Sequence, residues 1–242
     1  MLKDLLFIDI ETVPAVPSFT ELDPVWQSLF CDKISKTVPE DMKPEDSYRK
    51  KAGILAEFGK IICISAAFFY QDTDGIWHLK MKSIAGDDEV ETLSIFTDLC
   101  TKLYRNNPPF QFAGHNIREF DIPYIGRRML INQLPLPPYL KIQDKKPWEL
   151  KMVDTMNWWK FGDHKNYVSL HLLATVLGIP TSKTDIDGSM VQDVYYQEKD
   201  LQRIINYCQQ DVVVTANIVL RFHNLPLLKP EHIQDISEYP LS

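Results

Sequence analysis

The stretch FIDIET, residues 7–12, places two acids in an apolar run near the start of the chain. The apolar residues 5–10 predict a buried first strand, with Asp9 and Glu11 two apart at its end. Because side chains alternate across a strand, both carboxylates point to one face. Burying them unpaired costs free energy, and a divalent cation such as Mg²⁺ would remove that cost. The alternative is a strand end that emerges into solvent.

Outward from this stretch, the apolar pattern predicts alternating strands and helices. Further strands are expected over residues 61–70, 76–83 and 110–114, and helices over residues 45–56, 87–104, 120–132, 169–177 and 200–222. This order predicts a mixed sheet flanked by helices, in one α/β domain over residues 1–224. Residues 15–58 are expected to be an insertion or cover without a core of its own. Residues 225–242 are expected to be a poorly ordered C-terminal tail.

The composition narrows the class of protein. The chain has 242 residues and a net charge of −7, which argues against binding nucleic acid by bulk electrostatics but suits an acidic site filled by divalent cations. The four cysteines show no CxxC pair, so neither a disulfide framework nor structural zinc is expected. The N-terminus does not resemble a signal peptide, and the apolar run 61–69 is too short to span a membrane. A cytoplasmic protein without membrane contact is therefore expected.

Two later motifs carry further carboxylates. In GHNIREFDIPYI, residues 114–125, Asp121 follows a strand and enters the next helix. Its structural alternative is a helix N-terminal residue. In YCQQD, Tyr207 and Asp211 are four apart and therefore share one helical face. Their alternative is an exposed polar stripe, so neither motif identifies a site by itself.

The set and order of these residues resembles the DEDD superfamily of 3′-5′ exonucleases. A tyrosine at 207, where a sister branch has histidine, is similar to the DEDDy branch, above all to the exonuclease domain of family B DNA polymerases and the stand-alone bacterial proteins like it. The resemblance runs from about residue 5 to residue 220. It includes FGKIICIS (residues 58–65), LGIP (177–180) and KTDIDG (183–188). It implies a ribonuclease H-like mixed β-sheet flanked by α-helices.

The resemblance also implies the activity and its cofactors. A metal-dependent 3′-5′ exonuclease would release nucleoside monophosphates from the 3′ end of single-stranded nucleic acid, with DNA as the favoured strand, by using two divalent ions (Mg²⁺ or Mn²⁺). By resemblance, Asp9 contacts both metals, while Glu11 and Asp211 hold the metal that activates water. Asp121 helps to hold the second metal, and Tyr207 orients the attacking water. Nothing in the sequence indicates a protein partner.

Substrate contacts are expected at three further residues. By resemblance, Thr12 would contact the terminal nucleotide and Asn116 the sugar. Phe120 would stack on a base, with packing in the core as an equal alternative. A frayed single-stranded end suits such a site, because stacking surfaces accept any base.

Several other features remain open. Residues 141–167 interleave lysines and aromatics, Lys145 and Trp148 among them. This stretch either binds along a nucleic-acid strand or is a solvated loop anchored by its tryptophans, and the loop is slightly favoured. KTDIDG predicts a turn near the mouth of the site. Asp154 is expected to be a strand-end acid and His115 a structural residue.

Two rival functions follow from the same residues. A catalytically silent nucleic-acid-binding module would lack one or more acids, yet all four are present. A sugar hydrolase also uses paired carboxylates, but it gives the Tyr-x-x-x-Asp helix no role. Release of mononucleotides or of sugars from model substrates separates these alternatives. No polymerase domain is expected, because the exonuclease-like region already fills the chain.

Overall fold

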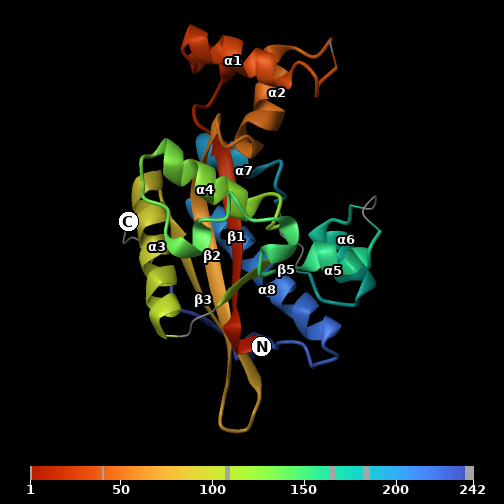
Figure 1. Cartoon of the computed structure of the whole chain (residues 1–242). Helices are drawn as coiled ribbons and strands as arrows, with labels where there is room; N and C mark the ends of the chain where they lie inside the picture. The colour runs from red at the N-terminus through yellow and green to blue at the C-terminus, as the bar shows by residue number, and fades with distance from the viewer. Residues whose placement is uncertain (1, 40, 107–109, 164–166, 182–185, 238–242) are drawn as a thin grey trace.

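A central mixed sheet organises the computed structural model of the chain (Figure 1). The structure describes residues 2–39, 41–106, 110–163, 167–181 and 186–237. In these residues, the six strands are β1 (Leu5–Pro14), β2 (Gly59–Gln71), β3 (Trp77–Ala85), β4 (Gln111–Gly114), β5 (Met152–Asp154) and β6 (Ile233–Asp235). The α-helices are α1 (Pro24–Ile34), α2 (Pro44–Lys51), α3 (Glu89–Asn106), α4 (Asp121–Ile131), α5 (Thr155–Lys160), α6 (Leu170–Val176), α7 (Val191–Asp193) and α8 (Leu201–Phe222). The predicted mixed sheet flanked by helices is confirmed.

Strand β1 lies in the middle of the sheet, whose order is β5-β4-β1-β2-β3-β6. It pairs antiparallel with β2 and parallel with β4. Strands β2 and β3 form a hairpin whose turn is closed by side-chain hydrogen bonds: Asp72 Oδ1 accepts the N–H groups of Asp74 (3.0 Å) and Ile76 (2.9 Å), and Gly75 adopts a φ of 79°. The register of β1 against β2 shifts between Glu11 and Thr12, and such irregularities re-aim the side chains beside them.

The two faces of β1 pack against different helices. Leu6, Ile8 and Ile10 join the apolar layer under α3 and α4. Leu5 and Phe7 join the layer under α8, on the opposite face. The alternation continues along the strand, so the residues after Phe7 that point to α8 are the two acids of FIDIET.

Residues 15–58 form a cap at one end of the sheet, where Figure 1 shows α1 and α2. The cap has a small apolar cluster of its own, in which the Phe30 ring lies 5.1 Å from the rings of both Tyr48 and Phe58. The expectation that this stretch has no core is therefore wrong. Its aromatic residues are too scattered in sequence to show a period, yet they converge in space.

The C-terminal residues also differ from expectation. Strand β6 pairs parallel with β3, Leu79 opposite Ile233, so a poorly ordered tail is wrong for residues 225–237. Strand β3 would otherwise offer an unpaired edge, which β6 covers. Residues 238–242 lie outside the described part of the chain. No helix in that part is both long enough and apolar enough to cross a membrane.

Candidate active site

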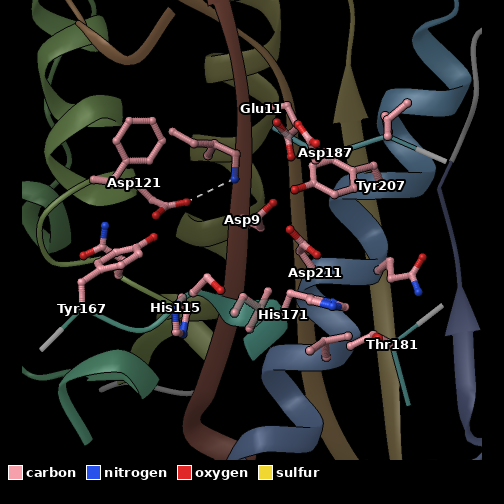
Figure 2. A pocket seen from close by; sticks show the side chains of 18 residues that line it. Asp9, Glu11, His115, Asp121, Tyr167, His171, Thr181, Asp187, Tyr207 and Asp211 are labelled. Carbon is pink, nitrogen blue, oxygen red and sulfur yellow. Dashed lines mark hydrogen bonds between the residues drawn. The ribbon is translucent and has the colours of Figure 1, made fainter. Parts of the chain in front are cut away.

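A pocket of about 660 Å³ opens where β1, the loop after β4, and helices α6 and α8 meet (Figure 2). It collects the predicted site residues from three distant parts of the sequence. Those that line it are Asp9, Glu11, Asn116, Phe120, Asp121, Tyr207 and Asp211. Thr12 lines a different pocket, together with Gly188.

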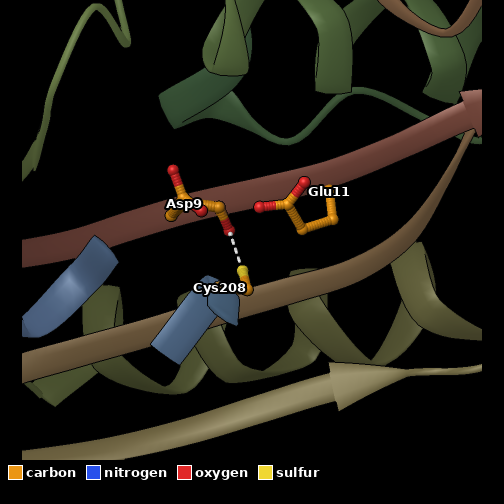
Figure 3. Close-up of side chains that lie close together, drawn as sticks. All are labelled: Asp9, Glu11 and Cys208. Carbon is orange, nitrogen blue, oxygen red and sulfur yellow. Dashed lines mark hydrogen bonds between the residues drawn. The ribbon is translucent and has the colours of Figure 1, made fainter. Parts of the chain in front are cut away.

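Strand β1 holds Asp9 and Glu11 in its middle, because the strand continues to Pro14 instead of ending at residue 10. Glu11 is only 8% exposed, which removes the alternative of a strand end in solvent. One ligand atom each from Asp9, Glu11 and Cys208 lie within 4.8 Å of one another (Figure 3). Asp9 Oδ2 is buried and has no hydrogen-bond partner in the described residues. Such an orphaned oxygen fits a cation ligand.

Burial raises the pKa of each of the four carboxyl groups in the pocket, and neighbouring acids add to the rise for Asp9, Glu11 and Asp121. Burial raises the pKa of Asp9 well above its ordinary value, and the charges of Glu11, Asp211 and Asp121 raise it further. Burial and then Asp211 do the same to Glu11. Burial also raises the pKa of Asp121 to about 7 and that of Asp211 to about 6. Four acids that share a pocket in this way favour either protons or cations.

Asp121 is placed by both a helix and a strand. It is the first residue of α4, is 3% exposed, and accepts the N–H of Ile10 through Oδ1 at 3.2 Å (Figure 2). Strand β4 ends at Gly114 and no longer pairs with β1 at this level. The carboxylate thus satisfies a backbone donor of β1 and fixes its own position beside Asp9.

Helix α8 presents Tyr207 and Asp211 to β1. Burial raises the pKa of Tyr207, and the charges of Asp211, Glu11 and Asp9 raise it further. The phenol therefore stays protonated at neutral pH. Its hydrogen bond to Asp211 offsets part of the rise that burial causes in the pKa of that acid.

Cys208 is the one unpredicted member of the acidic cluster. Its Sγ donates to the backbone oxygen of Asp9 at 3.4 Å (Figure 3). Burial raises the pKa of this thiol, and metals are bound by the thiolate. We therefore interpret Cys208 as a neutral thiol whose hydrogen bond to the backbone oxygen of Asp9 joins α8 to β1. No spacing in the sequence marks it, because it meets Asp9 only through the packing of α8.

Asp154 organises the loop that carries Asn116. It lies at the end of β5, is 1% exposed, and accepts the N–H groups of Asn116 (3.1 Å), Arg118 (3.2 Å) and Met156 (3.0 Å). This agrees with the expectation of a strand-end acid. Asn116 is held in the left-handed region with a φ of 62°, a conformation that asparagine tolerates better than most residues.

His115 lines the pocket but has both ring nitrogens occupied. Nδ1 lies 2.9 Å from Thr155 Oγ1, and Nε2 lies 2.9 Å from the carbonyl oxygen of Val168. A carbonyl only accepts, so Nε2 carries the proton. Burial lowers the pKa of His115. The ring is thus neutral and structural, as expected.

The described end of KTDIDG, residues 186–188, borders the pocket, as expected for a turn near the mouth of the site. Asp187 lines the pocket and accepts the N–H (2.8 Å) and hydroxyl (2.6 Å) of Ser189. Those hydrogen bonds lower the pKa of Asp187, so it is engaged in its own turn. Lys183 and Asp185 lie outside the described residues.

Residues 141–167 divide between core and solvent. Trp158 packs on Phe222 at 5.7 Å, as the anchored-loop interpretation expects. Trp148 is 77% exposed, with Lys146 Nζ over its ring at 5.3 Å. Tyr167 lines the pocket together with His171. Only tertiary packing brings those two residues to the site.

Comparison with known proteins agrees with this architecture. Among solved structures, the chain is similar to the family B DNA polymerase from the hyperthermophilic archaeon Pyrobaculum calidifontis, with a TM-score of 0.51 and 15% identity over 90% of this chain and 24% of that chain. A search of curated protein sequences found no match.

A family profile identifies the chain directly. The profile described as "Predicted 3'-5' exonuclease related to the exonuclease domain of PolB" matches residues 54–235. The matched range contains Asp121, Tyr207 and Asp211, whereas Asp9 and Glu11 precede it. The predicted resemblance is confirmed, and the chain belongs to the family of predicted 3′-5′ exonucleases related to the exonuclease domain of PolB.

Proposed function

We propose that this protein is a metal-dependent 3′-5′ exonuclease that hydrolyses phosphodiester bonds at the 3′ end of single-stranded nucleic acid, DNA by preference, and releases nucleoside monophosphates. One observation carries the proposal: Asp9 and Glu11 lie side by side in the middle of a strand, and Asp9 Oδ2 is buried without a partner in the described residues. Asp121 and Asp211 line the same pocket. Mutual repulsion makes such a cluster unfavourable unless cations fill it.

The donor set suits two hard divalent cations. Carboxylate oxygens are the ligands that Mg²⁺ and Mn²⁺ prefer. Asp9, Glu11, Asp121 and Asp211 would hold them. When bound, the ions would neutralise charge on the scissile phosphate and activate water at neutral pH.

Tyr207 positions water in this scheme and does not act as a base. Its pKa is raised by burial and by the neighbouring acids, so the hydroxyl keeps its proton. Because Tyr207 and Asp211 are hydrogen-bonded on one face of α8, the phenol is held in a fixed direction. A water that hydrogen-bonds to this oxygen is oriented for attack in the pocket.

Asn116 and Phe120 would contact the end of the strand. Asn116 Oδ1 is buried without a partner in the described residues, which leaves an acceptor for a sugar hydroxyl. The Phe120 ring lines the pocket and also packs on Tyr124 at 5.3 Å, so stacking and core packing are compatible. Thr12 lines a different pocket and would contact the terminal nucleotide from there.

The test is one nuclease assay with matched substrates. Single-stranded DNA and RNA, labelled at the 5′ end and either free or blocked at the 3′ end, are incubated with Mg²⁺, Mn²⁺ or EDTA. We expect a ladder that shortens from a free 3′ end, faster on DNA, and only with metal. Hydrolysis that survives EDTA or a 3′ block would contradict the proposal. Binding without any product would instead support the silent module.

A further inference from the structure

Residues 167–171, which lead into α6, form one wall of the pocket, and together with α5 before them they are defined here as the rim segment (residues 155–163 and 167–177). Tyr167 and His171 of this segment line the pocket, and Figure 2 shows Tyr167 below Asp121 and His171 below Asp211. Tyr167 is nevertheless 71% exposed. Its ring therefore belongs both to the pocket and to the outer surface.

The rim segment carries a second, more exposed ring. Phe161 follows α5, is 86% exposed, and has a φ of 44°; Gly162 after it has a φ of 89°. Phe161 is the C-cap of α5, where a left-handed conformation is common but glycine is the usual residue, so a bulky exposed ring is unfavourable at this position. Trp158 already anchors the segment against Phe222, so Phe161 is not needed for that purpose.

We propose that the rim segment is a stacking surface for the unpaired bases of a single-stranded nucleic acid whose 3′ end lies in the pocket. Tyr167 takes the base nearest the pocket, and Phe161 takes one further along the strand. The inference rests on the proposed function and specifies how its substrate is chosen. Bases offer their faces to aromatic rings only where they are unpaired, so a duplex gains nothing from this surface.

The charge of the protein favours stacking over phosphate contacts. A net charge of −7 gives little general attraction for a polyanion. Affinity must then come from local contacts, and aromatic stacking is tolerant of sequence. A lipid surface is the other occupant that exposed aromatics attract. Because Tyr167 lines the pocket as well as the outer surface, a single-stranded nucleic acid is favoured over a lipid surface. Binding of vesicles measures the alternative.

The test measures binding of fluorescein-labelled oligothymidylates to the full chain in EDTA, by anisotropy. Tyr167→Ala should weaken binding of strands of about 4 and about 12 nucleotides roughly tenfold. Phe161→Gly should weaken only the longer strand, about fivefold, while the protein unfolds at an equal or higher temperature, because glycine accepts the positive φ. Trp148→Ala removes an exposed ring that does not line the pocket, and it is the matched control with unchanged binding.

Three results would overturn the inference. The first is equal loss in Trp148→Ala; the second is unchanged affinity in both rim variants. The third is a loss of phosphatidylcholine vesicle binding in Phe161→Gly with oligonucleotide binding intact. Nucleotide release by the wild-type protein from a dinucleotide reports the proposed function separately. If release occurs and the rim variants bind normally, only the stacking surface is wrong.

Discussion

The two faces of β1 use one backbone for two purposes. Leu6, Ile8 and Ile10 face α3 and α4, and each is at most 4% exposed. The face toward α8 begins in the same way with apolar residues and then changes to Asp9 and Glu11. From Leu6 to Ile10 one face is apolar and stabilises the sheet, while the other gives up apolar burial for the acids Asp9 and Glu11. Substitutions on the two faces should therefore have opposite consequences for stability and activity.

Asp9→Asn tests the acidic face and should have the largest effect. We expect turnover of single-stranded DNA to fall about 10³-fold, because removing a shared metal ligand loses several kcal/mol of transition-state stabilisation. The metal-free variant should unfold at a higher temperature than the wild type at neutral pH, since it no longer buries a carboxyl group whose ionised form is disfavoured by burial and by the neighbouring acids. Nuclease kinetics and thermal unfolding in EDTA measure the two changes.

Cys208→Ser is the control for Asp9→Asn. It alters a neighbour in the same cluster whose thiol we interpret as neutral. We expect metal-dependent turnover to persist in this variant. Full activity of Asp9→Asn would remove Asp9 from the site, and loss of metal-dependent turnover in Cys208→Ser would make the thiol a ligand.

Ile8→Ala tests the apolar face. Removing a side chain that is 2% exposed should cost about 2–5 kcal/mol of unfolding free energy, from lost burial and the cavity left behind. Turnover per folded molecule should be retained at temperatures well below the transition. Urea unfolding and nuclease assays on the same samples separate the two quantities. A nuclease defect as large as that of Asp9→Asn would show that the faces are not independent.

Tyr207→Phe should have a smaller effect on the acidic face. We expect turnover to fall roughly 10- to 100-fold, because the attacking water loses its orienting partner. The concentration of Mn²⁺ at half-maximal activity should change little, since Tyr207 is not one of the four proposed metal ligands. Tyr195→Phe, on the same side of the sheet but outside the pocket, is the matched control. An unchanged rate in Tyr207→Phe would exclude Tyr207 from the mechanism.

The long elements of the fold could be predicted from local pattern. The apolar runs of β1, β2 and β3 and the helical period of α3 and α8 extend over enough residues to be recognised. Strands β5 and β6 have three residues each, and their pairing depends on β4 and β3. Helix α1 exposes Val25, Trp26 and Leu29, so its apolar residues do not form a single face. Tertiary contacts decide these elements, and the sequence pattern does not contain them.

The site likewise contains residue pairs that local spacing predicts and contacts that only tertiary packing creates. The pleat of a strand relates Asp9 to Glu11, and one helical turn relates Tyr207 to Asp211, so spacing alone predicts each pair. The bond from Ile10 to Asp121 and the support of Asn116 by Asp154 join segments far apart in the chain. Local rules cannot supply those contacts; the family resemblance named Asp121 and Asn116 as site residues but not the hydrogen bonds that place them.

The pH dependence of metal stabilisation should give the smallest effect and contrasts the two faces directly. In the metal-free fold the pKa of Asp121 is about 7 and that of Asp211 about 6, above an ordinary value of about 4 in the unfolded chain. The folded state therefore binds more protons between these values, and this contribution to stability is present below pH 4 and lost as the pH rises to about 7. Mn²⁺ competes with those protons, so it should raise the unfolding temperature more at pH 8 than at pH 5. The difference should be about 2–4 °C for each kcal/mol by which metal binding raises the free energy of unfolding more at the higher pH. Ile8→Ala should keep this difference, whereas Asp9→Asn should reduce it; an equal effect of Mn²⁺ at both pH values would show that the acids do not bind the metal.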